Sequence, residues 1–138
     1  MIQKILSTKV SDKQLNIALL ILRATVGVLM AHHGYGKITH FNEYSEKFMD
    51  FLYLGPKISL ALVIFAEFFC SLLLIAGLFT RFAIIPLVIA MGIAAFKAHG
   101  GDVFGDGEMA FLYFAIYVAL WLKGAGEYSA DKYLFNKD

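Results

Sequence analysis

Four long apolar segments constrain this chain more than any other feature of its sequence. A transmembrane helix needs about 20 mostly apolar residues, so four such helices use about 80. The chain has 138 residues, of which 59% are apolar and only 17% are charged, against about 25% charged in a typical soluble domain. The segments predict a small polytopic membrane protein. They exclude a disordered chain, a disulfide-rich scaffold and a nucleic-acid-binding protein.

The expected spans cover approximately residues 14-36, 58-80, 82-98 and 108-123. The first contains Arg23 and the second contains Glu67, while the last two are short and need snorkelling lysine or arginine ends. Their apolar runs do not alternate with polar residues, which favours helices over barrel strands. We therefore predict an all-α, integral membrane four-helix transmembrane bundle that forms a single domain, 1-138. A soluble four-helix bundle is the alternative, but the third segment has almost no polar face.

A short amphipathic helix is expected between the first two spans, at residues of about 42-54. Apolar and aromatic residues recur there at helical spacing, with acidic residues and a lysine between them. Gly55-Pro56 ends the segment. Two interpretations remain open: a helix lying in the membrane interface, or a loop helix packed on the end of the bundle.

The distribution of lysine and arginine predicts the orientation in the membrane. With a cytoplasmic N-terminus, the inner side carries seven cations and the outer side four. The inner set is Lys4, Lys9, Lys13, Arg81, Lys123, Lys132 and Lys137, and the outer set is Lys37, Lys47, Lys57 and Lys97. We expect both termini to be cytoplasmic.

Arg23 and Glu67 are ionisable residues inside expected spans, where a charge costs at least about 2.5–3.5 kcal/mol. Arg23 lies ten residues beyond Lys13, and Glu67 lies ten residues beyond Lys57, about 15 Å along each helix. If both lysines mark a membrane surface, the two charges reach the same depth from opposite sides. We predict a structural buried ion pair between them. It would either fix helix register or act directly in ligand binding or proton transfer.

One face of the first span combines charge with small residues. Gly27, Met30, Gly34 and Lys37 all fall within about 40° of Arg23 on a helical wheel. Glycines on such a face allow close approach of a neighbouring helix or a flat ligand. His33 lies at the border of this face and His32 on the far side, so His33 is the better candidate for a site.

The outer ends of the helices carry a second set of candidate residues. The predicted ligand-binding residues are Lys37, Lys97, His99, Tyr113 and Tyr117, and the catalytic candidates are Glu67, Arg23 and His33. In this prediction Glu67 forms the floor of an outer pocket and the two tyrosines, four residues apart, form a wall. The alternative is that the outer lysines and histidines are individual interfacial anchors.

Several common chemistries lack their motifs. Cys70 is the only cysteine, which excludes an internal disulfide and a CxxC redox pair. No pair of histidines has haem or zinc spacing on one helix face, so no metal site is expected. No flavin or nicotinamide motif is present either. The glycine-rich acidic loop of residues 99-108 does not match a calcium-binding loop and is expected to be a flexible turn.

The order of several short motifs resembles the DoxX family of small four-helix membrane proteins. These are Arg23 with Gly27, then Gly34-Tyr35-Gly36-Lys37, then Glu67, then Gly77-Leu78-Phe79-Thr80-Arg81. The resemblance extends over residues of about 15 to 123. It implies a multi-pass protein of the bacterial cytoplasmic (inner) membrane and a link to quinone-coupled redox systems. An oxidoreductase activity is implied by this resemblance alone.

The residues and the resemblance together lead to one leading hypothesis. The chain would be a component of a membrane redox system that binds a quinone-like or other small lipophilic molecule near the outer side. The possible partners are the lipid bilayer and a redox-enzyme subunit. Two alternatives remain: a non-catalytic membrane assembly or scaffold subunit, and a small transporter that would need to oligomerise.

Overall fold

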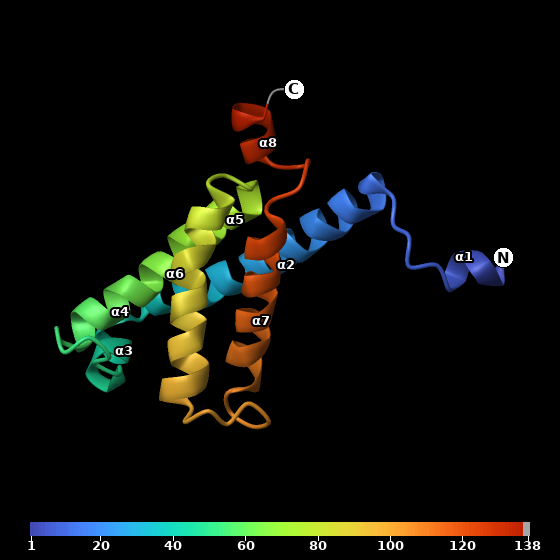
Figure 1. The fold of residues 1–138 in the computed structure, drawn as a ribbon. Helices are drawn as coiled ribbons and strands as arrows, with labels where there is room; N and C mark the ends of the chain where they lie inside the picture. The colour runs from blue at the N-terminus through green and yellow to red at the C-terminus, as the bar shows by residue number, and fades with distance from the viewer. Residues whose placement is uncertain (137–138) are drawn as a thin grey trace.

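The computed structural model describes residues 1–136, and within them the regular structure is entirely helical (Figure 1). The Lys137 predicted for the inner side lies outside the described residues. In chain order the elements are α1 (Ile2–Ile5), α2 (Asp12–Thr39), α3 (Phe41–Lys47), α4 (Pro56–Ile64), the π-helix η1 (Phe65–Cys70), α5 (Ser71–Ala76), α6 (Thr80–Ile93), the π-helix η2 (Ala94–Ala98), α7 (Glu108–Lys123) and α8 (Ala130–Phe135).

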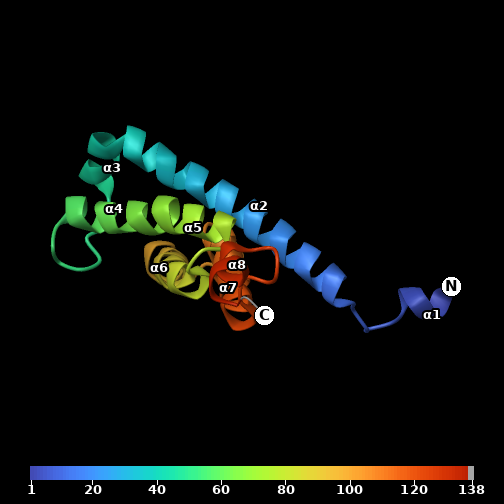
Figure 2. The same ribbon diagram turned by 90° about the horizontal axis from the view of Figure 1, so that it is seen from above.

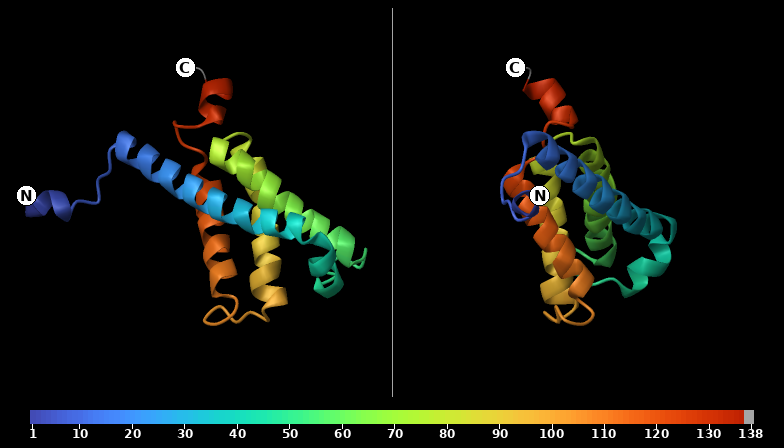
Figure 3. Two further views of the ribbon diagram at one scale, coloured as in Figure 1. Left: turned by 180° about the vertical axis from the view of Figure 1, so that it is seen from behind. Right: turned by 90° about the vertical axis from the view of Figure 1, so that its right-hand side faces the viewer.

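The long helices form two crossing hairpins. In one, α4, η1 and α5 make a continuous rod that runs antiparallel to α2; in the other, α6 with η2 runs antiparallel to α7. Figure 2 looks nearly along the axes of α6 and α7 while α2 and α4 are seen from the side, so the hairpins cross steeply. The two views of Figure 3 show the same crossing from behind and from the side. The helices are therefore not aligned along a common bundle axis.

Three helical stretches in the described part of the chain are long and apolar enough to cross a membrane: Asp12–Thr39, Pro56–Ala76 and Thr80–Ala98. They coincide with the first three expected spans. The fourth expected span forms α7, a helix of 16 residues, which is shorter than the roughly 20 residues that a span requires.

The ends of α2 and its buried face follow from its sequence. Ser11 caps the helix: its hydroxyl accepts from the Gln14 amide at 3.2 Å, and the Gln14 side chain accepts from the Ser11 amide at 3.0 Å. Met30 and Gly34 are buried on the same side as Arg23 and Gly27. The predicted glycine-containing face of this helix is confirmed as its packed face.

The segment between the first two spans differs from its prediction. The helix α3 ends at Lys47 rather than near residue 54, and Phe48 adopts an extended conformation. Asp50 explains why the chain leaves the helix: its Oδ1 accepts from the Gly55 amide at 3.2 Å and from the Ser59 hydroxyl at 3.4 Å. The Asp50 carboxylate therefore serves the start of α4 instead of a continued helix.

Two short helices, α1 and α8, lie outside the expected spans. Helix α8 packs over the end of the molecule where α6 begins and α7 ends. Its first-turn Asp131 accepts from the Phe79 amide at 2.7 Å and from the Thr80 amide at 2.9 Å. Asp131 thereby supplies the cap that the first residues of α6 lack in their own sequence.

Candidate functional site

An ion pair between Lys37 and Glu67 joins α2 to η1. Lys37 Nζ lies 2.5 Å from Glu67 Oε2, with side-chain exposures of 19% for Lys37 and 4% for Glu67. Burying a carboxylate without a partner costs free energy. The ion pair with Lys37 offsets this cost and explains why a charged residue is tolerated at position 67. The lysine is only partly buried, so the pair lies at the edge of the helical packing and not in its centre.

Glu67 belongs to a stretch of unusual backbone. It is the third residue of the π-helix η1, which joins α4 to α5 within one rod. Single π-helical turns inside α-helices occur frequently at functional sites, because they displace side chains from the regular helical face. The second π-helix, η2, contains Lys97. Both π-helical stretches thus carry an ionisable residue inside an apolar helix.

The expected ion pair between Arg23 and Glu67 is wrong, because the two helices pack in a different register. A Cβ atom placed on Gly34 would lie 2.7 Å from the Phe68 backbone nitrogen and 3.0 Å from the Glu67 carbonyl carbon. Position 34, not position 23, is therefore opposite Glu67. The offset of eleven residues corresponds to about 16 Å along α2, beyond the reach of either side chain.

Arg23 is nevertheless buried, with 1% of its surface exposed. Its Nη1 donates to the Ala125 carbonyl, and its Nη2 donates to the Tyr128 carbonyl at 2.7 Å. Gly77 makes room for this arrangement, since a Cβ there would lie 3.0 Å from Arg23 Cζ and 2.5 Å from Ser129 Cβ. Arg23 fastens the segment after α7 to α2; it does not neutralise Glu67.

Aromatic and hydroxyl side chains from α2, α5 and α7 lie near Glu67. The rings of Tyr113 and Tyr117 stack at 5.9 Å, and the ring of His33 meets Tyr113 edge-on at 6.5 Å. Tyr117 faces Ser71 and both tyrosines lie within electrostatic range of Glu67. The Tyr117 hydroxyl and the Ser71 hydroxyl are buried and face each other, and neither forms a hydrogen bond of standard geometry within residues 1–136. We call Lys37, Glu67, His33, Tyr113, Tyr117 and Ser71 the Glu67 cluster.

Ser71 is the member of this cluster that sequence reasoning missed. It lies four residues after Glu67, a spacing that places it on nearly the same helix face. The spacing of four residues could have identified Ser71 as a neighbour of Glu67 from the sequence. Its burial against α7, however, depends on how the two hairpins cross.

Lys97 and His99 are not brought to the Glu67 cluster. Both are exposed, and neither side chain forms a hydrogen bond, ion pair or ring contact with the other candidates within residues 1–136. No group of three or more His, Cys, Asp or Glu residues in that range is placed to hold a metal ion. Cys70, the last residue of η1, is buried as a free thiol.

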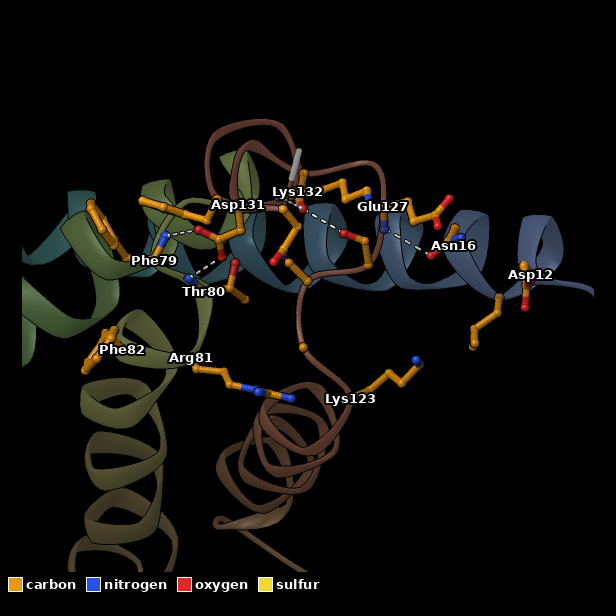
Figure 4. Close-up of a pocket in the computed structure, with 17 residues that line it drawn as sticks. Asp12, Asn16, Phe79, Thr80, Arg81, Phe82, Lys123, Glu127, Asp131 and Lys132 are labelled. Atoms are coloured by element: carbon orange, nitrogen blue, oxygen red, sulfur yellow. Dashed lines mark hydrogen bonds between the residues drawn. The ribbon is translucent and has the colours of Figure 1, made fainter. Parts of the chain in front are cut away.

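A cavity of about 850 Å³ lies at the other end of the molecule (Figure 4). It is bounded by the first turns of α2, the start of α6, the end of α7 and the C-terminal segment. Sequence reasoning did not predict it, because its walls come from four separated parts of the chain. It does not include any residue of the Glu67 cluster.

The fold and this cluster define a class of protein: an all-helical membrane protein with a buried carboxylate–lysine pair between its helices. Comparison with family models identifies the class more closely, because the DoxX model matches residues 18–100. The chain therefore belongs to the DoxX family, as its motif order indicated. Comparisons with curated proteins and with solved structures find no match.

Proposed function

We propose that this DoxX-family membrane protein is a component of a membrane redox system and binds a quinone-like or similar small lipophilic molecule at the Glu67 cluster. The observation that carries the proposal is the ion pair of Lys37 with Glu67 at a π-helical turn, bordered by two stacked tyrosines. A charged pair with aromatic neighbours at the edge of apolar helices suits a ligand that is mostly hydrophobic and has a few polar oxygens.

The chemistry of the pair matches both redox forms of such a ligand. The Lys37 ammonium can donate to a carbonyl oxygen, and the Glu67 carboxylate can accept from a hydroxyl. Reduction of a quinone to a quinol takes up two electrons and two protons. The electrons would come from a partner redox protein, because the sequence has no dinucleotide fingerprint and only one cysteine.

The hydroxyl groups behind the pair support a route for the protons. Tyr117 and Ser71 present buried hydroxyls that face each other without a hydrogen bond of standard geometry in the described part of the chain, and Tyr113 stacks on Tyr117. Buried hydroxyls of this kind are usually satisfied by ordered water or by a neighbouring group. We assign Tyr113, Tyr117 and Ser71 to proton exchange with Glu67, and His33 to the outer edge of the site beside Tyr113.

The proposed membrane arrangement has α7 as a fourth span and both termini in the cytoplasm. Lys123 and Glu108 bound α7 and can extend it by snorkelling to the two interfaces. The chain 1–138 then forms one transmembrane domain of the bacterial cytoplasmic membrane. In this orientation the Glu67 cluster opens toward the outer half of the bilayer.

The amount of quinone bound to the purified protein tests the proposed binding site directly. We would purify the wild-type protein from membranes, extract it with organic solvent and quantify quinone per protein chain by chromatography. Wild type should retain quinone, whereas K37M and Y113F should retain several-fold less. K97M is the matched control, because Lys97 is also an outer lysine but lies outside the cluster; it should behave as wild type.

Three results contradict the proposal. These are absence of quinone from the wild type even after reconstitution with added quinone, equal retention by K37M, and equal loss in K97M. Absence of quinone combined with co-purification of a stable redox-enzyme complex would instead support the scaffold alternative. Solute flux into liposomes would support a transporter.

A further inference from the structure

The cavity of about 850 Å³ at the start of α6 has walls from distant parts of the chain, and hydrogen bonds hold these parts together. The C-terminal segment is held by Arg23 through the Ala125 and Tyr128 carbonyls. Asn16 of α2 accepts from the Glu127 amide at 3.0 Å. Figure 4 shows the residues that line the cavity, with Asn16 bonded to Glu127 and Asp131 bonded to the start of α6. The cavity is thus enclosed on several sides by backbone that is tied in place.

Two cations line this cavity at the start of α6 and the end of α7. Arg81 Nε donates to the Trp121 carbonyl at 3.1 Å, and Arg81 Nη2 donates to the Leu122 carbonyl at 3.3 Å. These bonds hold the guanidinium at the end of α7 and leave Nη1 without a partner in the described part of the chain. Lys123 follows directly in sequence and also lines the cavity.

The cavity also contains uncompensated groups of both signs. Lys132, Asp12 and Glu127 line it, and none of the three forms an ion pair within residues 1–136. Asp131 differs from them because two backbone amides already occupy its carboxylate. The free charges are therefore three cations, including Arg81 and Lys123, and two carboxylates.

Thr80 is an independent sign that a ligand belongs here. Its side chain lines the cavity and is 2% exposed, yet its hydroxyl has no hydrogen-bond partner among residues 1–136. Buried hydroxyls are normally bonded, so an unbonded one at the wall of a cavity points to a missing polar partner.

Large exposed apolar side chains flank the two cations in sequence. Phe82 follows Arg81 and is 76% exposed, and Leu122 precedes Lys123 and is 67% exposed. Cations next to exposed apolar residues at the ends of apolar helices in a membrane protein lie at the level of lipid headgroups. A ligand with a charged head and an apolar tail could contact both the cations and the exposed apolar side chains.

We propose that this cavity is a binding site for a membrane phospholipid whose headgroup carries both a phosphate and a free ammonium group, as in phosphatidylethanolamine. Arg81 and Lys123 bind the phosphate, Thr80 donates to a headgroup oxygen, and Glu127 with Asp12 receives the ammonium. A purely anionic headgroup would leave the two carboxylates facing a negative charge. The site is separate from the Glu67 cluster and does not depend on the function proposed for it.

Native mass spectrometry of the full chain, released from detergent after incubation with defined lipids, tests this site. We expect phosphatidylethanolamine to be retained about tenfold better than phosphatidylglycerol, because each charge-assisted hydrogen bond contributes about 1.5–3 kcal/mol. Soluble glycerophosphoethanolamine should compete only weakly, since it lacks the acyl chains. Strong competition by this soluble compound would overturn the assignment to a lipid.

Variants locate the binding. K123M and E127Q should each weaken retention of phosphatidylethanolamine about tenfold, and neither side chain is used in a hydrogen bond within the described residues. K97M, at the opposite end of the α6–η2 helix, should retain the lipid as wild type does. Equal retention of the three lipids phosphatidylethanolamine, phosphatidylglycerol and phosphatidylcholine would overturn the proposal, as would unchanged retention in both K123M and E127Q.

Discussion

Gly34 of α2 packs directly against the backbone of Phe68 in η1. A Cβ atom at position 34 would lie 2.7 Å from the Phe68 nitrogen, a distance that requires the backbone to shift. This contact sets how α2 lies on the π-helical turn, and it brings Lys37, three residues further along, to Glu67. The absence of one side chain therefore positions the charged pair.

Replacement of Gly34 should be costly for this reason. We expect G34A to lower the free energy of unfolding by about 1–3 kcal/mol, as for other overpacked contacts. The measurement is thermal unfolding in a fixed detergent. G36A is the matched control, because nothing lies within 4 Å of the added methyl group; alanine should leave the stability unchanged or raise it slightly. Equal effects of the two variants would contradict the packing argument.

The Lys37–Glu67 pair should show strong energetic coupling. Removal of one partner leaves a buried charge uncompensated, so K37M should destabilise the protein by about 3–5 kcal/mol. E67Q removes the charge of Glu67, and the double variant K37M/E67Q should recover most of the loss. A double-mutant cycle in detergent measures this coupling. Additive effects of K37M and E67Q would show that the two side chains act independently.

The bonds of Arg23 should hold the C-terminal segment in place. R23M removes both donors to the Ala125 and Tyr128 carbonyls while keeping an apolar stem of similar length. We expect cleavage by a non-specific protease within residues 124–129 to become several-fold faster, because the segment opens more often. K13M, a change at an exposed position of the same helix, should leave this cleavage unchanged. Unaltered cleavage of R23M would show that other contacts hold the segment.

Loss of the Asp131 carboxylate should destabilise the start of α6. D131A leaves the Phe79 and Thr80 amides without their acceptor, and loss of a helix cap costs about 0.5–2 kcal/mol. Phe79 has a left-handed backbone with φ of 48°, so its conformation depends on this support. Thermal unfolding measures the effect. D106A, in the exposed loop before α7, is the control and should unfold at the same temperature as wild type. An unfolding midpoint of D131A equal to that of D106A would contradict the role of Asp131 as a helix cap.

The helical segments and the packed face of α2 were predictable because they depend on local sequence. Apolar length predicted the three spanning stretches, and the spacing of Arg23, Met30 and Gly34 predicted the buried side of α2. Periodicity is a property of one helix at a time, so no knowledge of neighbours is needed. The end of α3 at Lys47 was missed because Asp50 serves the next helix, a choice that spacing does not reveal.

The partners of the charged residues were not predictable in the same way. The depth argument paired Arg23 with Glu67 by assuming that Lys13 and Lys57 mark the two membrane surfaces. In the structure α2 extends beyond the end of α5, so its N-terminal half meets the C-terminal segment instead. A shift along a helix changes every partner without changing any local pattern.

The sequence alone determined that this protein is helical, belongs in a membrane and carries Arg23 on the packed face of α2, because hydrophobic length and periodicity act within each segment. Only the tertiary structure decided that Lys37 neutralises Glu67, that Arg23 fastens the C-terminal segment, and that Arg81, Lys123 and Thr80 border a common cavity. Those relationships depend on helix register and on close approach at glycines. They are set by the packing of the whole chain rather than by any one segment.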